Sequence, residues 1–362
     1  MFQSLTVDLA DRSYPIRVGC GLLGDPSALE VPGLRDGNVL LISDDQVAPL
    51  YAPAVRETLI RLGCRVRLAT VPAGETSKCG EWLFSLYREA AEAGLDRRSW
   101  AVALGGGVIG DLAGFFAATW LRGIRILQIP TSLLAMVDSS VGGKTAIDLP
   151  QGKNLVGAFH QPSGVVADLE ALSTLPPRQI RSGLAEVIKT AAIADAEFFQ
   201  TLEKEPSVFS KPWNLSGETL ITRCCRIKAD VVGTDEREAG RRALLNFGHT
   251  LGHAIEAGLG YGEILHGEAV SIGMVFAARL SERLLGFPPS EFKRLYHLLE
   301  AAGLPVRWPD LSWSAVRKYM ALDKKNESGA LRFVLLSHLG GARSGCEAPE
   351  SVLEEVWHAG RQ

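Results

Sequence analysis

Histidine side chains gather in one short stretch of the chain. Of seven histidines, His249, His253 and His266 fall within eighteen residues. His249 and His253 stand four residues apart in an apolar segment of helical periodicity, so both share one face of the predicted helix. Two imidazole nitrogens and one carboxylate form a ligand set that leaves an open position on a catalytic divalent metal, usually zinc. The cluster therefore predicts a metal site rather than three separate core histidines.

Three glutamates, Glu186, Glu256 and Glu268, are candidates for the carboxylate ligand on spacing alone. All three lie in or beside segments of helical periodicity, so the sequence pattern leaves the choice between them open. The motif H-E-x-x-H does not occur in the sequence. Its absence disfavours a zinc peptidase.

A glycine-rich turn provides a second candidate site. Residues 105–110 read GGGVIG, which fits G-x-G-x-x-G, and they follow an apolar strand and precede a helical segment. Glycines in this context let backbone N–H groups approach a pyrophosphate at a helix N-terminus. The next predicted strand does not end in the acidic residue that usually binds the ribose. Asp44, which follows the apolar run 39–43, is the candidate for that contact.

A second glycine motif, residues 141–145 (VGGKT), resembles the end of the phosphate loop of nucleotide hydrolases. That loop requires a glycine five residues before Gly143, and this chain has Asp138 there. The difference argues against a nucleoside triphosphatase.

Cationic side chains interrupt segments that are otherwise apolar. A single lysine or arginine of this kind usually extends its charged end into solvent. Facing one cleft, the whole set would instead form a pocket for phosphate and carboxylate groups. Its members are Arg122, Lys144, Lys153, Lys189, Lys228, Arg242 and Lys324.

The segments that must position these residues follow two patterns. In the first half, short apolar runs alternate with helical segments at 47–62 and 81–93, which favours a mostly parallel sheet with helices on both faces. We expect its strands at 38–43, 66–71, 100–104, 125–130 and 164–168. After Pro176 and Pro177 the periodicity is almost entirely helical. We expect helices at 179–203, 217–232, 244–257, 267–285 and 290–302, and one strand at 331–336.

These patterns predict two domains. Residues 1–175 should form a Rossmann-like α/β nucleotide-binding domain, in which the glycine turn joins a strand to a helix. Residues 176–362 should form a mainly α-helical domain that binds the metal and the substrate. The histidine cluster lies entirely in this second domain.

The composition excludes several classes of protein. Hydrophobic residues make up 46% and charged residues 22%, which is typical of a globular protein and not of a disordered chain. The net charge is −3, so no basic excess is present for nucleic-acid binding. Segment 100–121 is apolar, but Asp111 and five glycines within it argue against a membrane span. The six scattered cysteines and the N-terminal sequence, which does not read as a secretion signal, favour a reduced, cytoplasmic protein.

Several longer motifs together match one known family. The chain resembles 3-dehydroquinate synthase, a sugar phosphate cyclase, over about residues 44–326 and most densely over 105–268. Because these motifs are long and keep one order along the chain, they are more specific than the short patterns above. The matching segments are 74–78, 105–111, 122–125, 129–144, 152–159, 183–189, 246–253 and 323–326.

The resemblance implies an enzyme of the shikimate pathway, which leads to chorismate and the aromatic amino acids. Members of this family convert DAHP (3-deoxy-D-arabino-heptulosonate 7-phosphate) to 3-dehydroquinate and phosphate. They use a tightly held NAD that is reduced and then reoxidised, and a divalent metal that is typically zinc, with cobalt as an alternative. The implied partner is thus a phosphorylated sugar acid, and we expect a cytoplasmic homodimer.

The family pattern also implies roles for individual positions. Glu186, His249 and His266 match metal ligands, whereas His253, a ligand on spacing alone, matches a residue that handles substrate and protons. Ser132 and Trp120 stand where threonine and tyrosine are frequent. The positions that match NAD contacts are Asp44, Glu75, Lys78, Gly107, Asp111, Thr131, Ser132, Lys144 and Lys153. The positions that match the catalytic and substrate cluster are Asp138, Lys144, Lys153, Asn154, Lys189, Lys228, Arg242, Asn246, His253 and Lys324, with Arg122 near the phosphate.

Three other functions stay open. A valiolone-type or deoxy-inosose cyclase would act on a substrate without the carboxylate, and Arg242, Asn246 and His253 disfavour it because they fit the dehydroquinate pattern. A metal-dependent polyol dehydrogenase would release NADH, and the set Lys144, Lys153 and Asn154 argues against it. A regulatory nucleotide-binding module would leave the histidine and glutamate set and the cationic side chains unexplained.

Overall fold

The computed structural model describes residues 2–205, 209, 215–260, 262–321 and 331–360. It divides into two compact units, Met1–Pro176 with Pro212–Gly233 and Pro177–Lys211 with Thr234–Gln362. The first division falls within the Pro176-Pro177 pair. Helix α7 (Leu215–Thr234) returns to the first unit for nearly its whole length. The sequence pattern does not predict that α7 belongs to the first unit, because a helix shows the same periodicity in either unit.

A seven-stranded sheet forms the centre of the first unit, as far as the described residues show, in the order β1-β2-β9-β6-β5-β3-β4. Strand β1 pairs with β2 in the antiparallel direction, and the other neighbours in the sheet are parallel. The strands are β1 (Phe2–Val7), β2 (Tyr14–Gly19), β3 (Asn38–Asp44), β4 (Arg65–Val71), β5 (Trp100–Gly105), β6 (Arg125–Pro130) and β9 (Gly164–Asp168).

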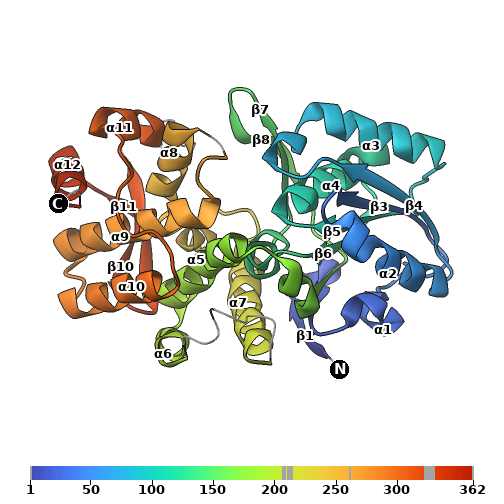
Figure 1. The fold of residues 1–362 in the computed structure, drawn as a ribbon, viewed down its shortest axis with the longest axis horizontal. Coiled ribbons are helices and arrows are strands. Elements are labelled where there is room, and N and C mark those ends of the chain that lie inside the picture. The colour runs from blue at the N-terminus through green and yellow to red at the C-terminus, as the bar shows by residue number, and fades with distance from the viewer. Residues whose placement is uncertain (1, 206–208, 210–214, 261, 322–330, 361–362) are drawn as a thin grey trace. The chain divides into compact units, whose positions relative to one another are not determined.

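Helices cover both faces of this sheet (Figure 1). Leu41 and Val102 belong to the core on the side of α1 (Pro26–Leu29) and α2 (Ala48–Arg61). The neighbouring Leu40 and Ala101 belong to the core on the side of α3 (Gly80–Glu92) and α4 (Gly107–Thr119). Alternate residues of each strand thus enter opposite cores, which explains the continuous apolar runs in the sequence. The α/β fold predicted for this half is confirmed. The hairpin β7 (Lys144–Leu149) with β8 (Gly152–Phe159) also belongs to this unit.

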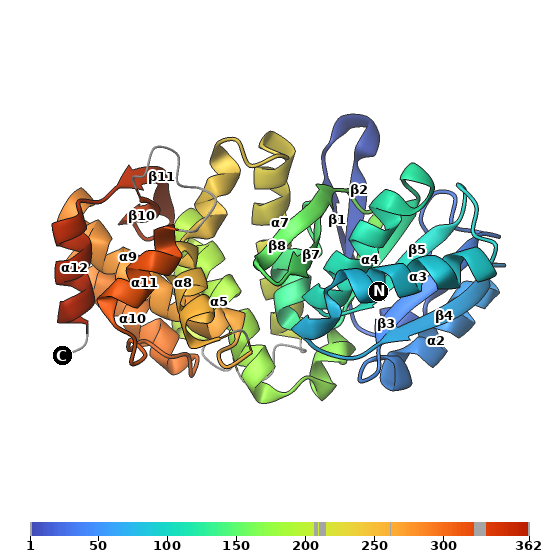
Figure 2. The same cartoon turned by 90° about the horizontal axis from the view of Figure 1, so that it is seen from above.

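The second unit is built around helix α9 (His266–Leu285), whose residues are buried almost without a break from Gly267 to Ser281. Figure 2 shows α5 and α8 beside it, and both contact it. The mainly helical character predicted for this half is confirmed. The other elements are α5 (Pro177–Ala194), α6 (Ala196–Lys204), α8 (His249–Leu259), α10 (Pro289–Ala301), α11 (Trp313–Ala321), α12 (Glu350–Ala359) and the hairpin β10 (Arg332–His338) with β11 (Gly341–Glu347).

Two of the predicted helices are interrupted. The helix predicted at 179–203 breaks at Asp195, whose carboxylate accepts the backbone N–H of Phe198 at 2.9 Å and caps α6. The helix predicted at 244–257 begins instead as a 3₁₀ turn, η8 (Arg241–Asn246). Gly248, at φ 81°, separates this turn from α8 in a conformation that favours glycine.

No helix of the described ranges is both long enough and apolar enough to cross a membrane. This agrees with the expectation that segment 100–121 is not a span. In the structure that segment consists mainly of β5, the glycine turn and α4, which follow one another along the chain.

Candidate functional site

Three helices of the second unit bring Glu186, His249 and His266 together. Glu186 lies in the middle of α5, His249 is the first residue of α8, and His266 is the first residue of α9. The Nε2 atoms of His249 and His266 lie 3.7 and 3.8 Å from Oε1 of Glu186. These three side chains form a group whose ligand atoms all lie within 4.8 Å of one another.

Close packing at glycines sets this arrangement. A Cβ added at Gly267 would lie 1.9 Å from the carbonyl oxygen of Ser182, one helical turn before Glu186. The backbone N–H of Gly267 also donates to Oγ of Ser182 at 3.0 Å. On the other side of α9, a Cβ at Gly273 would lie 1.9 Å from the carbonyl oxygen of Gly248. The glycines therefore let α9 approach both helices that carry its partner residues.

We expect Gly267→Ala to weaken metal binding. The new methyl group cannot fit beside Ser182, so the start of α9 must move away from α5 and carry His266 with it. Overpacking of this kind typically costs about 1–3 kcal/mol of stability. Isothermal titration with Zn²⁺ should show at least a tenfold rise in Kd, and thermal unfolding should show a lower Tm. Gly24→Ala is the control, because no atom lies within 4 Å of its added Cβ, and unchanged zinc affinity in Gly267→Ala would contradict this packing role.

The chemistry of the cluster fits a divalent cation. Glu186 is 1% exposed, and within the described residues neither carboxylate oxygen accepts a hydrogen bond of normal geometry. Lys189, one turn further along α5, forms an ion pair with it. Ligands about 2.0–2.2 Å from a tetrahedral ion lie about 3.3–3.6 Å apart, close to the separations between Glu186 and the two histidines. A buried carboxylate without regular hydrogen bonds is a group that a cation would stabilise.

The two histidines differ in their surroundings. Burial and the charge of Lys189 hold the pKa of His249 well below its ordinary value, so this imidazole stays neutral and able to bind a metal. Its Nδ1 lies 3.2 Å from the carbonyl oxygen of Phe247. Burial also disfavours a charge on His266, but the hydrogen bond and the charge of Glu256 outweigh it and raise the pKa of this imidazole.

The structure shows which of the three candidate glutamates lies at the metal site, a choice that sequence spacing could not make. Glu268 caps the start of α9 by accepting the N–H of Leu265, and Arg178 binds both of its oxygens at 2.7 and 2.8 Å. Glu256 lies 3.1 Å from Nδ1 of His266, the nitrogen opposite to the one that faces Glu186. Glu186 is thus the carboxylate that both Nε2 atoms face. His253 is exposed, and its ring centre lies 5.4 Å from that of His249.

Arg242 and Asn246 lie four residues apart in η8 of the same unit. Arg242 is 2% exposed, and its guanidinium donates to the backbone carbonyl of Glu236. Oδ2 of Asp235 accepts the backbone N–H of Arg242 at 2.8 Å and so fixes the turn before η8. Asn246 donates from Nδ2 to Oε1 of Glu238 at 2.5 Å. A planar guanidinium beside a side-chain amide suits the binding of a carboxylate.

The glycine turn in the first unit has the predicted strand–turn–helix form. β5 ends at Gly105 and α4 starts at Gly107. A Cβ added at Gly105 would lie 2.7 Å from Ile109, and one at Gly110 would lie 3.0 Å from Gln128 of β6. The first and last glycines therefore allow close packing of α4 against the sheet. The free backbone N–H groups of the first turn of α4 point out of the N-terminal end of the helix, which begins at Gly107. This geometry suits a pyrophosphate.

Several residues predicted to contact NAD or substrate interact around the buried Lys78, beside this turn. Nζ of Lys78 lies 2.5 Å from Oδ2 of Asp111 and 2.5 Å from Oδ1 of Asn154. Lys153 lies 3.7 Å from Glu75. Burial opposes a charge on Lys78, but the carboxylates of Asp111 and Glu75 outweigh it and raise its pKa, so Lys78 is a cation. The hairpin β7–β8 thus joins the predicted NAD contacts to the predicted substrate contacts.

The other predicted residues of the first unit lie at separate positions. Lys228 of α7 donates to the backbone and to the carboxylate of Asp138, at 2.6 and 2.5 Å. Asp44 accepts the N–H groups of Gln46 and Val47 at the start of α2. Thr131 follows β6 and donates its backbone N–H to Gly105 at 2.9 Å, and Ser132 comes next.

Two exposed cations complete the set. Arg122 is exposed and adopts a φ of 69° in the turn after α4, and Lys144 is exposed at the start of β7. Lys324 lies outside the described residues.

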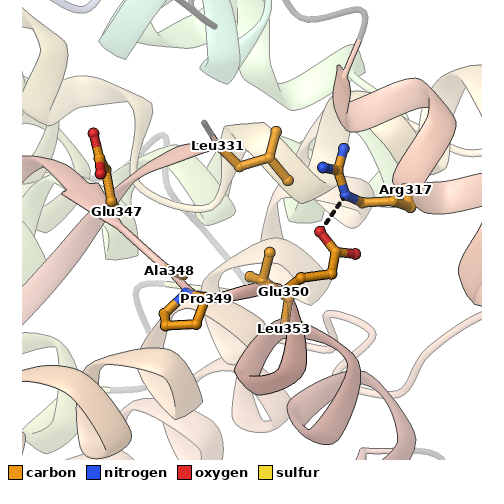
Figure 3. Close-up of a pocket in the computed structure, with 7 residues that line it drawn as sticks. All are labelled: Arg317, Leu331, Glu347, Ala348, Pro349, Glu350 and Leu353. Carbon is orange, nitrogen blue, oxygen red and sulfur yellow. Dashed lines mark hydrogen bonds and ion pairs between the residues drawn. The ribbon is translucent and has the colours of Figure 1, made fainter. Parts of the chain in front are cut away.

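A pocket of about 380 Å³ lies elsewhere in the second unit (Figure 3). Arg317 binds Glu350 at 2.7 Å on one side of it, and Leu331 and Leu353 line it as well. None of the predicted site residues within the described ranges lines this pocket. It is therefore separate from the candidate site.

Comparison with known families gives the decisive match. A model of the 3-dehydroquinate synthase N-terminal domain matches residues 68–182, and a model of the 3-dehydroquinate synthase C-terminal domain matches residues 183–326. The chain belongs to the 3-dehydroquinate synthase family. Both matches meet within α5, close to the division between the two units. Membership of this family makes the chain an enzyme of the sugar phosphate cyclase type.

Solved structures of sugar phosphate cyclases are similar along their whole length. A 2-epi-5-epi-valiolone synthase from Streptomyces hygroscopicus, with NAD⁺ and Zn²⁺ bound, has 27% identity and a TM-score of 0.89, covering 97% of this chain and 98% of its own. A 2-deoxy-scyllo-inosose synthase complexed with carbaglucose-6-phosphate, NAD⁺ and Co²⁺ has 29% identity and a TM-score of 0.86, covering 99% and 100%. A probable glycerol dehydrogenase from Sinorhizobium meliloti, at 15% identity and a TM-score of 0.66, covers 95% of both chains and shares the fold.

Two residues of the site have roles that sequence reasoning did not find. Glu238 contacts Asn246 and has a φ of 60°, which is unusual for a residue other than glycine. Its position in a polar stretch gave no signal in the sequence. Glu256 was a candidate metal ligand on spacing, but it contacts the far side of His266. The spacing of seven residues between His249 and Glu256 correctly predicted that both lie on one face of α8. It did not predict that Glu256 contacts Nδ1 of His266.

Proposed function

We propose that this chain is a 3-dehydroquinate synthase that converts DAHP to 3-dehydroquinate and phosphate. The observation that carries the choice of substrate is the buried Arg242, four residues before Asn246 in η8 of the unit that holds the metal cluster. A guanidinium binds a carboxylate through two parallel hydrogen bonds. DAHP carries a carboxylate, whereas valiolone-type and deoxy-inosose cyclases act on sugar phosphates without one.

The proposed cofactors are NAD and a divalent metal. A metal bound by Glu186, His249 and His266 would lower the free energy of negative charge that develops on the hydroxyl groups of the substrate. NAD at the glycine turn would accept a hydride and return it in the same turnover. Related cyclase structures that contain NAD⁺ with Zn²⁺ or Co²⁺ support both assignments.

The side chains of the protein would bind and orient the substrate. In this proposal Arg242 holds the carboxylate, Lys144 and Lys153 contact the substrate, and Arg122 lies near the phosphate. His253 is exposed, and its ring centre lies 5.9 Å from that of His266, so in this proposal its imidazole transfers a proton to or from the substrate. Lys228 is held by Asp138, so its ammonium has a fixed position from which to bind a substrate oxygen.

One experiment separates this function from its alternatives. The purified, metal-loaded protein should release phosphate from DAHP, while the absorbance of NADH stays unchanged after a single turnover. A catalytic amount of NAD should be sufficient, because each turnover restores it. Net production of NADH would indicate a polyol dehydrogenase. Absence of phosphate release from DAHP, together with release from a sugar phosphate that has no carboxylate, would indicate another cyclase.

Arg242→Lys should lower kcat/KM for DAHP by at least about tenfold. Lysine keeps the positive charge but loses the planar pair of donors. Loss of one hydrogen bond to a charged group costs about 1.5–3 kcal/mol, and 1.4 kcal/mol corresponds to one factor of ten. The measurement is the initial rate of phosphate release across DAHP concentrations. Arg283→Lys, an exposed position on α9, is the matched control, and equal rates in Arg242→Lys and the native protein would argue against a carboxylate at Arg242.

A further inference from the structure

His266 faces a different carboxylate with each of its ring nitrogens. Nε2 lies 3.8 Å from Oε1 of Glu186, and Nδ1 lies 3.1 Å from Oε2 of Glu256. The first separation is too long for a hydrogen bond and suits two ligands of one cation, whereas the second is a hydrogen bond. Glu256 is 5% exposed and lies on α8, seven residues after His249.

We propose that Glu256 is a positioning residue for the metal site. It accepts the Nδ1–H of His266 and so holds the ring with the lone pair of Nε2 directed toward Glu186. The inference rests on the metal-binding part of the proposed function and is independent of which sugar phosphate the enzyme uses.

The two tautomers of a neutral imidazole place the proton on different nitrogens. Only the tautomer with the proton on Nδ1 has a lone pair on Nε2 for a metal. A carboxylate at Nδ1 stabilises that tautomer and also makes Nε2 a stronger ligand. In His249 the backbone carbonyl of Phe247 has the same role, since it lies 3.2 Å from Nδ1. Both histidines therefore present Nε2 to Glu186.

His266 needs such a partner more than His249 does. The side chain of His266 is 32% exposed, compared with 11% for His249. The buried carboxylate of Glu256 thus supplies a restraint that packing around His266 supplies only in part.

The arrangement has one competing explanation. His253, Glu256 and His266 also form a group whose ligand atoms lie within 4.8 Å of one another, so Glu256 could itself bind a cation. That ion would have to use Nδ1 of His266, and it would leave the buried carboxylate of Glu186 with only one of its two histidines. His253 is also exposed, whereas Glu186 is fully buried. The geometry points to the cation site at Glu186 and to Glu256 as the support of His266.

The first test measures binding of the metal alone. Zn²⁺ affinity by competition with a chromophoric chelator should fall by about 10–100-fold in Glu256→Gln, which keeps the shape and removes the charge. The native protein and the variant should both bind one ion per chain at saturation. Glu282→Gln is the matched control, because it removes a carboxylate from the far end of α9, where Arg279 binds it at 2.9 Å. Unchanged affinity in Glu256→Gln would overturn the proposal, and so would two ions in the native protein with one lost in the variant.

The second test needs no substitution at Glu256. Nitrogen-15 NMR of the native, Zn²⁺-loaded protein reports which ring nitrogen of each histidine carries the proton, and His266→Ala assigns the signals. We expect a protonated Nδ1 and a zinc-bound Nε2 for His266. The opposite tautomer would overturn the proposal even where Glu256→Gln fails to fold. Neither test uses DAHP, so a different substrate for the enzyme would leave both results unaffected.

Discussion

Replacing His249 with alanine is expected to remove the bound metal and to lower kcat by at least about 1000-fold. His249 lies at the centre of the cluster, and its Nε2 faces the buried carboxylate of Glu186 at 3.7 Å. A metal acting on developing charge contributes several kcal/mol to catalysis, and about 4 kcal/mol corresponds to 1000-fold. The measurements are metal content by mass spectrometry and phosphate release from DAHP.

The control for this variant is His297→Ala, which removes an imidazole from α10 whose side chain is 73% exposed. This control should keep both its metal and its activity. A metal-free His249→Ala protein with native activity would contradict the assignment of the cluster.

Gly107→Val should raise the Kd for NAD by at least about 100-fold. Gly107 is the first residue of α4, and even a single Cβ there would lie 3.0 Å from Oγ of Ser139. A branched side chain must therefore extend into the space in front of the helix N-terminus, where a pyrophosphate would bind. A loss of about 2.8 kcal/mol in binding free energy corresponds to this change in Kd. Calorimetric titration of NAD measures it.

Gly80→Val is the matched control for this second variant. Gly80 is also the first residue of a helix, α3, and no atom lies within 4 Å of its added Cβ. Binding of Zn²⁺ should be native in both variants, because the metal cluster lies in the other unit. Native NAD affinity in Gly107→Val would show that the dinucleotide binds elsewhere.

Much of the first unit could be predicted from the sequence. Strands β3, β4, β5, β6 and β9 appear as apolar runs because both faces of the sheet are covered by helices. Strands β1 and β2 and the hairpin β7–β8 were not predicted. Several of their residues are exposed, such as Leu155 at 39% and Val156 at 37%, so they give no continuous apolar run. Among their pairings in the described part of the chain, only that of β2 with β9 joins strands that are distant in the sequence.

The sequence predicted that a metal site exists, but spacing alone did not identify all of its ligands. The i, i+4 histidines correctly indicated a cluster on one helix face, but the same reasoning gave His253, which is exposed, the same weight as the buried His249. Spacing could not choose among Glu186, Glu256 and Glu268, because the choice depends on how α5 and α9 pack. The contact of Gly267 with Ser182 makes that choice, and no local pattern encodes it.

The most direct measurement of the proposed function compares kcat/KM for DAHP with that for a seven-carbon sugar phosphate that lacks the carboxylate. Both rates come from the same phosphate-release assay with the same metal-loaded protein and catalytic NAD. If Arg242 and Asn246 bind a carboxylate, DAHP should be favoured by at least about 100-fold, which corresponds to roughly 3 kcal/mol of charge-assisted hydrogen bonding. Equal values for the two substrates would contradict the assignment as a 3-dehydroquinate synthase.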